Sequence, residues 1–203
     1  MTYVLVRIYT GSGERSVDEL LQTAGQELAP QVIKAGCKRY SIVKFTDGRF
    51  GSSSFYEDRA AADRGSQIAA KWVAETGAMK GHKLAQTVSG EAVYMFQGDQ
   101  NAQAKEGEIR IYQTSASRGD VEAAMREEAQ PLLQTIKGLV RYTCFKLDDA
   151  KGYAVITGHT NRESSTQLSQ KAREVRQKSG SRLQRVLPKD PEVLQGTIFH
   201  SYT

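Results

Sequence analysis

The feature that most constrains this chain is an internal repeat. The tripeptide Arg-Ile-Tyr occurs at 7–9 and again at 110–112, and the glycine-led segment 36–40 is matched by 138–142. The offset between the two copies stays at 102 or 103 residues. A constant offset of this kind indicates one structural unit that occurs twice.

A short polar stretch separates the two copies. Residues 98–107 read GDQNAQAKEG, a composition typical of a linker. The predicted domains are therefore a first repeat over 1–98, a linker over 99–106 and a second repeat over 107–203.

Each copy contains the same series of periodic segments. Apolar residues alternate with other residues over 3–10, which predicts a strand, and they follow helical spacing over 17–32, which predicts an amphipathic helix. Ser16 with Glu19 has the spacing of a capping box, and Asp120 is the N-cap that we expect in the second copy. Two strands, a second helix and a last strand follow in both copies.

The order strand-helix-strand-strand-helix-strand, found twice, predicts an α+β fold of two tandem ferredoxin-like (βαββαβ) repeats. A sheet of this type carries helices on one face and leaves the other face bare. Because a bare apolar face must be covered, we expect the two repeats to pack sheet to sheet as an intramolecular α+β barrel.

Composition narrows the classes of protein to which the chain could belong. The hydrophobic fraction is 39% and the charged fraction 25%, which is ordinary for a soluble globular protein. No segment approaches the roughly 20 apolar residues of a membrane span, and the N-terminus reads as a strand rather than a secretory signal. We therefore expect a cytoplasmic protein that does not associate with membranes.

Neither the cysteines nor the histidines have the spacing of a metal site. Cys37 and Cys144 are too few for a disulfide framework or a metal cluster. The three histidines, His82, His159 and His200, are scattered along the chain, so we predict no metal site. His159 and His200 fall on predicted strands, where a satisfied or solvated side chain is the expected role.

The net charge of +5 raises the possibility of a nucleic-acid partner. Much of the positive charge lies over 171–189, which we interpret as a solvated helix face. RNA-recognition modules share the predicted element order, but they need aromatic side chains on their strands for stacking on bases. Here Val155 and Ser52 stand at those positions, and Arg7 and Arg110 occupy the first strands, so nucleic acid is not the expected ligand.

The two copies resemble the dimeric α+β barrel superfamily, and within it the antibiotic-biosynthesis-monooxygenase-like proteins. The resemblance covers essentially the whole chain and rests on the segments 36–43, 50–58, 60–62, 71–72, 138–142 and 160–163. In that family two units, usually from separate chains, form the barrel. The resemblance implies that the two repeats form it here within one chain, and self-association of the whole chain stays open.

The resemblance also implies a range of functions. Members of the family include cofactor-independent oxygenases, heme-degrading oxygenases, isomerases and proteins without known chemistry. The implied function is binding of a small, partly apolar organic molecule, with cofactor-independent monooxygenase or isomerase activity. A non-catalytic barrel that binds a ligand or a protein is the alternative. The resemblance implies no cofactor, and heme is the alternative if the protein does bind one.

Trp72 and His82 are the candidates for a site. The heme-degrading and related members carry a tryptophan and a histidine at a similar separation, although the first strand here lacks the asparagine found in the heme-degrading ones. The resemblance implies a catalytic His82, as base or proton donor, beside a ligand stacked on Trp72. Val175 and Arg185 stand at the matching positions of the second copy, so we expect any active pocket in the first half.

Three further residues are candidates for ligand binding. Arg7 and Tyr9 alternate with apolar positions on the first strand, and they recur as Arg110 and Tyr112. These side chains either contact a ligand, which for the arginines would be anionic, or pack in matching positions in the two halves. Tyr40 is expected to be an aromatic core residue with its hydroxyl at the rim of a pocket.

Overall fold

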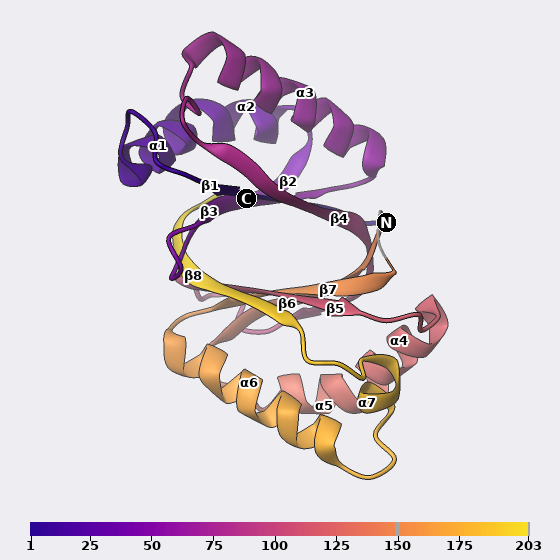
Figure 1. The fold of residues 1–203 in the computed structure, drawn as a ribbon. Coiled ribbons are helices and arrows are strands. Elements are labelled where there is room, and N and C mark those ends of the chain that lie inside the picture. Colours follow the sequence, from indigo (N-terminus) through magenta and orange to yellow (C-terminus); the bar gives the residue numbers. More distant parts are fainter. Residues whose placement is uncertain (149–150, 203) are drawn as a thin grey trace. The chain divides into compact units, whose positions relative to one another are not determined.

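The computed structural model describes residues 1–148 and 151–202 (Figure 1). By their contacts the residues divide into two compact units: Met1–Glu91 with Thr197–Thr203, hereafter the first unit, and Ala92–Gly196, hereafter the second unit. The repeat boundaries at 98 and 107 stay a prediction.

The first half of the chain contains four strands with helices between them. In chain order the elements are β1 (Tyr3–Thr10), α1 (Val17–Thr23), the π-helix η1 (Ala24–Leu28), α2 (Ala29–Lys34), β2 (Cys37–Phe45), β3 (Phe50–Tyr56), α3 (Arg59–Thr76) and β4 (Lys83–Gln97).

The described residues of the second half form four more strands. In chain order the elements are β5 (Glu106–Gln113), α4 (Arg118–Ala124), the π-helix η2 (Met125–Ala129), α5 (Gln130–Leu133), β6 (Leu139–Leu147), β7 (Gly152–His159), α6 (Arg162–Gln177), α7 (Arg182–Val186) and β8 (Glu192–Tyr202).

The strands form one closed barrel, so the predicted architecture of two ferredoxin-like sheets packed face to face is wrong. Their hydrogen-bonded order is β1-β3-β2-β8-β5-β7-β6-β4, and the last strand returns to the first. The prediction did not foresee that the long strands β4 and β8, of 15 and 11 residues, each join strands of both sequence halves. Each of them has a strand on both sides, and no strand of the ring keeps a free edge. Closure therefore satisfies backbone groups that two separate sheets would leave unpaired.

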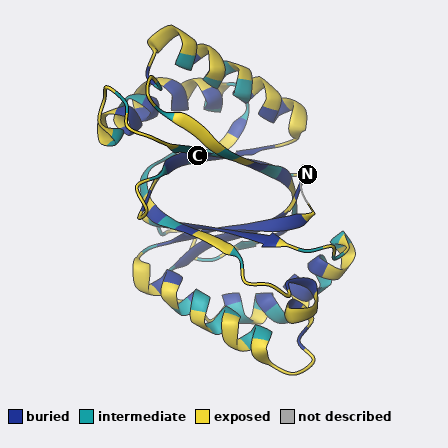
Figure 2. Ribbon diagram, viewed as in Figure 1, coloured by how far each residue is buried: buried dark blue, intermediate teal, exposed yellow. Residues whose placement is uncertain are grey.

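Within the first unit, the helices cover one face of the strands (Figure 1). Alternation along β1 directs Tyr3 and Leu5 toward the helices, where they join the core cluster that includes Leu20, Val32 and Trp72. The sides of the helices that face the strands are buried and their outer sides are exposed (Figure 2).

A serine side chain caps the N-terminus of the first helix in each unit. Ser16 accepts from the Glu19 backbone N–H and the Glu19 carboxylate accepts from Ser16, which confirms the capping box. In the second unit the N-cap is Ser117, so the prediction of Asp120 is wrong. Asp120 lies three residues inside and its backbone N–H donates to Ser117 Oγ at 3.2 Å.

Each first helix widens into a π-helix just before a proline. The Ala29 N–H donates to the carbonyl of Ala24, five residues back, and Gln130 does the same to Met125. Pro30 and Pro131 follow directly and lack the N–H that regular α-helical bonding needs. The wider turn accommodates the proline. The two π-helices correspond to each other in the two units, so Ala24, the first residue of η1, corresponds to Met125, the first residue of η2.

Among the described residues, none of the helices is both long and apolar enough to span a membrane.

The first unit needs the last strand segment of the chain. Ser201 hydrogen-bonds Ser41 at 3.1 Å, and Phe199 and Tyr202 pack on the first unit's core. A fragment of residues 1–98 lacks this segment and exposes the edge of β2, so we expect it to dimerise or aggregate. Size-exclusion chromatography and circular dichroism test this, with the full chain as control. A monomeric fragment with cooperative unfolding would contradict it.

Candidate functional site

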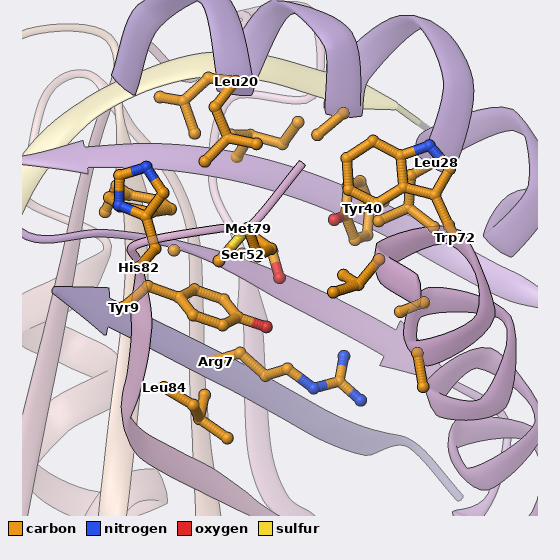
Figure 3. Close-up of a pocket in the computed structure, with 18 of the residues that line it drawn as sticks. Arg7, Tyr9, Leu20, Leu28, Tyr40, Ser52, Trp72, Met79, His82 and Leu84 are labelled. Atoms are coloured by element: carbon orange, nitrogen blue, oxygen red, sulfur yellow. The ribbon is translucent and has the colours of Figure 1, made fainter. Parts of the chain in front are cut away.

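A pocket of about 520 Å³ opens within the first unit, between its helices and its strands. Most of its wall is apolar, and its few polar residues come from β1, β2, β3, α3 and, in the case of His82, the loop before β4. Figure 3 shows the pocket, whose labelled residues are Arg7, Tyr9, Leu20, Leu28, Tyr40, Ser52, Trp72, Met79, His82 and Leu84. All five residues predicted to be functional line it: Arg7, Tyr9, Tyr40, Trp72 and His82.

Trp72 forms one end of the pocket. Its side chain is only 5% exposed, and its indole Nε1 donates to the Glu27 carboxylate at 2.9 Å. Glu27 lies on the π-helix η1 and is exposed, so the polar edge of the indole faces a carboxyl group at the surface. This hydrogen bond fixes the plane of the ring, which leaves its face available to a flat ligand.

A row of rings forms the opposite end. Tyr9 and Phe50 are stacked with their centroids 5.6 Å apart, and Phe50 meets His82 edge to face at 5.0 Å. Figure 3 shows Trp72 and His82 at opposite ends of the pocket. The sequence separation of ten residues that suggested a pair therefore places them on opposite walls.

The nitrogen atoms of His82 face the loop after β1. Nδ1 lies 3.2 Å from the Gly11 carbonyl oxygen, and a Cβ atom added to Gly13 would collide with Nε2. Nε2 is buried and has no hydrogen-bond partner in the described part of the chain. Gly13 thus allows close approach of this imidazole, whereas Gly11 allows close approach of the Gly81 backbone carbonyl. The catalytic role of His82 stays a prediction, because in this orientation its nitrogens do not point into the pocket.

The pocket residues do not fit heme. A histidine ligand to heme iron must present an unhindered ring nitrogen, whereas Nε2 of His82 is covered by Gly13 and Nδ1 faces a carbonyl. Heme also carries two carboxylates, and Arg7 is the one lysine or arginine of the pocket wall. In the described residues no group of three or more His, Cys, Asp or Glu could hold a metal ion.

Arg7 places a positive charge on this largely apolar wall. Its Nη2 donates to Ser66 Oγ at 2.6 Å, and the Ser66 hydroxyl donates in turn to the Ala62 carbonyl at 2.8 Å. No Asp or Glu lines the pocket, and no ion pair joins Arg7 to a carboxylate in the portion of the chain that is described. The charge of Arg7 is therefore balanced by no group of the wall.

Two phenols lie close to this charge. Burial raises the pKa of Tyr9, and Arg7 partly opposes that shift. Burial likewise raises the pKa of Tyr40 to about 12, and a hydrogen bond with Ser52 and the charge of Arg7 oppose it. Both phenols are protonated at neutral pH, so each can donate a hydrogen bond to a ligand oxygen.

Ser52, Ser66 and Phe50 were not predicted from the sequence. Ser52 lies directly opposite Arg7 in the β1–β3 register, and Phe50 lies opposite Tyr9. A serine carries little signal by itself, but a pairing of strand 50–56 with strand 3–10 would have identified both residues.

The second unit has a counterpart of Arg7 with a different environment. Arg110 donates from Nη2 to Ser169 at 2.6 Å, a serine 59 residues later, as Ser66 is for Arg7. Arg110 also forms a buried ion pair with Glu108 on the same strand. Glu108 accepts further hydrogen bonds from Ser165 at 2.8 Å and Gln195 at 2.6 Å, so this charge is balanced inside the protein.

At two other positions that correspond to the pocket wall, the second unit has a larger side chain than the first. Met125 begins η2 where Ala24 begins η1, and Val155 lies opposite Arg110 where Ser52 lies opposite Arg7. Tyr142 donates to Met125 Sδ at 3.4 Å, within the buried core of the second unit.

The other two histidines lie outside the pocket wall. His159 is fully buried, with Nδ1 2.9 Å from Ser164 Oγ and Nε2 2.8 Å from Thr157 Oγ1. Burial lowers its pKa to about 4, with Glu108 acting against that shift. His200 is 3.3 Å from Gln22. Both have hydrogen-bond partners, as expected for strand histidines.

Comparison with known proteins defines the fold. No family model matches the chain, and no curated protein matches it. Three solved structures are similar over almost all of both chains. An anthrone oxidase-like protein has 9% identity and a TM-score of 0.60, and the match covers 99% of this chain and 92% of that one. A candidate monooxygenase from Fusobacterium nucleatum has 6% identity and a TM-score of 0.69, with coverages of 100% and 94%, and a mutant chlorite dismutase from Candidatus Nitrospira defluvii has 10% identity and a TM-score of 0.67, with coverages of 98% and 91%.

These proteins belong to the dimeric α+β barrel superfamily. The chain has their fold. At 6–10% identity the likeness concerns the fold alone, and what the chain does must be argued from its own residues.

Replacing Gly13 with alanine tests the packing of His82. The added Cβ would collide with Nε2 and lie 2.6 Å from the Lys80 carbonyl oxygen, so Gly13→Ala should lower the free energy of unfolding by about 1–3 kcal/mol. Gly119→Ala is the control, because its Cβ would meet nothing closer than 4.0 Å in helix α4 and should stabilise by about 0.5–1 kcal/mol. Urea unfolding measures both. Equal effects would contradict the close packing.

Buried His159 predicts a pH dependence of stability. Its pKa is about 4 in the folded chain and 6.5 when exposed, so its contribution is complete above pH 6.5 and is lost as the pH falls toward 4. The loss should reach about 2–3 kcal/mol at pH 4. His159→Gln should make the free energy of unfolding fall less steeply over this interval than in the wild type. An unchanged slope would show that His159 is not neutral in the fold.

Proposed function

We propose that the first unit binds a small, flat, mostly apolar organic molecule in the pocket between Trp72 and the Tyr9–Phe50 rings. The observation that carries this proposal is the pocket itself: about 520 Å³, largely apolar, with a few convergent polar groups. Such a combination is typical of small-molecule sites, where apolar walls supply affinity and polar atoms fix orientation.

The polar groups of the pocket favour a ligand with an oxygen atom near β1. Tyr9, Tyr40 and Arg7 are all hydrogen-bond donors at neutral pH. Figure 3 shows the Tyr9 hydroxyl directed toward the middle of the pocket. A phenol, enol or carbonyl oxygen held there would leave the apolar body of the ligand against Trp72.

Cofactor-independent oxygenation is the reaction that we propose. The named activities of similar folds include an anthrone oxidase-like protein and a candidate monooxygenase, which supports oxygen chemistry without establishing it for this chain. In such a reaction a CH₂ group that is conjugated with a carbonyl through an aromatic ring, as in anthrone, loses a proton, and the resulting carbanion reduces O₂. One oxygen atom becomes the new carbonyl, the other leaves as water with the two hydrogens, and the substrate supplies all four electrons.

The residues can be given roles in this reaction. Arg7, Tyr9 and Tyr40 stabilise the enolate oxygen, and Trp72 positions the ring. His82 is the candidate base, which requires its imidazole to turn from Gly11 toward the pocket. A non-catalytic binding barrel is the alternative, and consumption of O₂ with anthrone separates the two. Isomerase activity has no observation of its own in its favour.

The second unit supplies the variant that tests binding. Ala24→Met introduces the side chain of Met125 into the pocket wall, so it should weaken binding of 2-naphthol and anthrone by at least about tenfold. Trp72 is the only tryptophan of the sequence, so quenching of its fluorescence reports binding at this pocket. Ser52→Val is a second variant in case Ala24→Met unfolds.

Ala74→Met is the matched control, because Ala74 is exposed on α3 and does not line the pocket. Its ligand affinity should equal that of the wild type. If neither ligand quenches Trp72, or if filling the pocket leaves the affinity unchanged, the proposed site is wrong. Binding without O₂ uptake would leave the non-catalytic barrel as the function.

A further inference from the structure

The two arginines of the first strands differ in how their charge is balanced. In the second unit the Glu108 carboxylate forms a buried ion pair with Arg110 and accepts further hydrogen bonds from Ser165 and Gln195. In the first unit Leu5 stands two residues before Arg7, where Glu108 stands before Arg110. The nearest helix also differs, since Ala62 precedes the arginine-binding Ser66 where Ser165 precedes Ser169.

Arg7 therefore retains hydrogen-bonding capacity toward the pocket. A guanidinium has five N–H groups, and the contact with Ser66 uses one of the two on Nη2. No nitrogen of Arg7 is among the buried, unpartnered side-chain atoms of the described residues, so the remaining donors are reached from the pocket or from solvent. Figure 3 shows the side chain extending along the pocket wall beneath the Tyr9 ring.

A positive charge on an apolar wall is costly unless an anion compensates it. The second unit compensates internally, whereas the pocket wall of the first unit contains no Asp or Glu. The field of Arg7 extends over the pocket, because it opposes the effect of burial on the pKa of both Tyr9 and Tyr40.

We infer that the pocket of the first unit selects flat organic molecules that carry a single anionic oxygen group, and that Arg7 takes the place of an internal ion pair by pairing with that group. This inference rests on the proposed function. Carboxylates, phenolates and enolates share the chemistry, since each offers oxygen acceptors for charge-assisted hydrogen bonds from a guanidinium. Cationic molecules are disfavoured because no wall residue compensates them.

The geometry divides the ligand into two parts. The apolar body lies against the face of Trp72, whose N–H is already used by Glu27. The anionic oxygen lies at the β1 side, where Arg7, Tyr9 and Tyr40 can all donate to it. Because the wall carries a single arginine and no lysine, one negative charge is matched and a second is not.

A pair of isosteric ligands tests the inference. Isothermal titration calorimetry at pH 7.5 and low ionic strength compares 2-naphthoate with the neutral 2-naphthamide. The wild type should bind 2-naphthoate about ten- to a hundredfold more tightly than the amide, which is the usual range for hydrogen bonds to a charged partner. Arg7→Gln should abolish this preference, so that the variant binds 2-naphthoate and 2-naphthamide with affinities that agree within about threefold.

Two further variants show whether the preference depends on the charge of Arg7 itself. Arg173→Gln removes one positive charge from an exposed position of α6 and should keep the full preference for 2-naphthoate. Leu5→Glu combined with Ala62→Ser introduces into the first unit the residue types found at Glu108 and Ser165, and it should remove the preference by neutralising Arg7 internally. If this double variant unfolds, Arg7→Gln still decides the question.

The outcomes separate the inference from the function on which it rests. Equal affinity for the two ligands in the wild type, or a preference that survives Arg7→Gln, overturns anion selection and leaves the binding pocket in place. Failure of both ligands to bind overturns the proposed function as well. A preference lost equally in Arg173→Gln would assign it to the net charge of the protein rather than to Arg7.

Discussion

A hydrogen bond from a strand arginine to a helix serine places a guanidinium between the helices and the strands of each unit. Arg7 reaches Ser66 and Arg110 reaches Ser169, both at 2.6 Å. Placing that charge in apolar surroundings creates a requirement for a compensating anion. In the second unit Glu108 provides this anion, and Met125 and Tyr142 contact each other in the buried core of that unit. In the first unit the corresponding space is a pocket.

The contrast between the units explains why small residues matter as much as the aromatic ones. Ala24 and Ser52 occupy positions where the second unit has Met125 and Val155, and the smaller side chains leave the faces of Trp72 and Tyr40 accessible. Rigid rings at the ends and small side chains at the sides produce a slot suited to a flat molecule. Gly13 contributes by admitting His82 to the wall.

The local elements could be predicted from the sequence, but the closure of the barrel could not. Alternation over 3–10 and the Ser16–Glu19 spacing are local signals, and the structure contains both the strand and the capping box. The N-cap at Ser117 was missed because Asp120 is also a favoured N-cap type, and both occur within one turn. The closure of the strands into one ring was missed because alternation along β4 and β8 gives the same pattern whichever strands pair with them. Trp72, Tyr40, Tyr9 and Arg7 could be found as pocket residues, whereas Ser52 and Ser66 emerge only from strand pairing and helix packing.

A crystal structure of the full chain soaked with 2-naphthoate shows whether the pocket of the first unit holds a flat anion against Arg7. We expect the naphthalene rings against Trp72 and the carboxylate within hydrogen-bonding distance of the Arg7 guanidinium. A ligand bound only in the second unit would rule this binding mode out. A carboxylate directed away from Arg7 into solvent would rule it out equally.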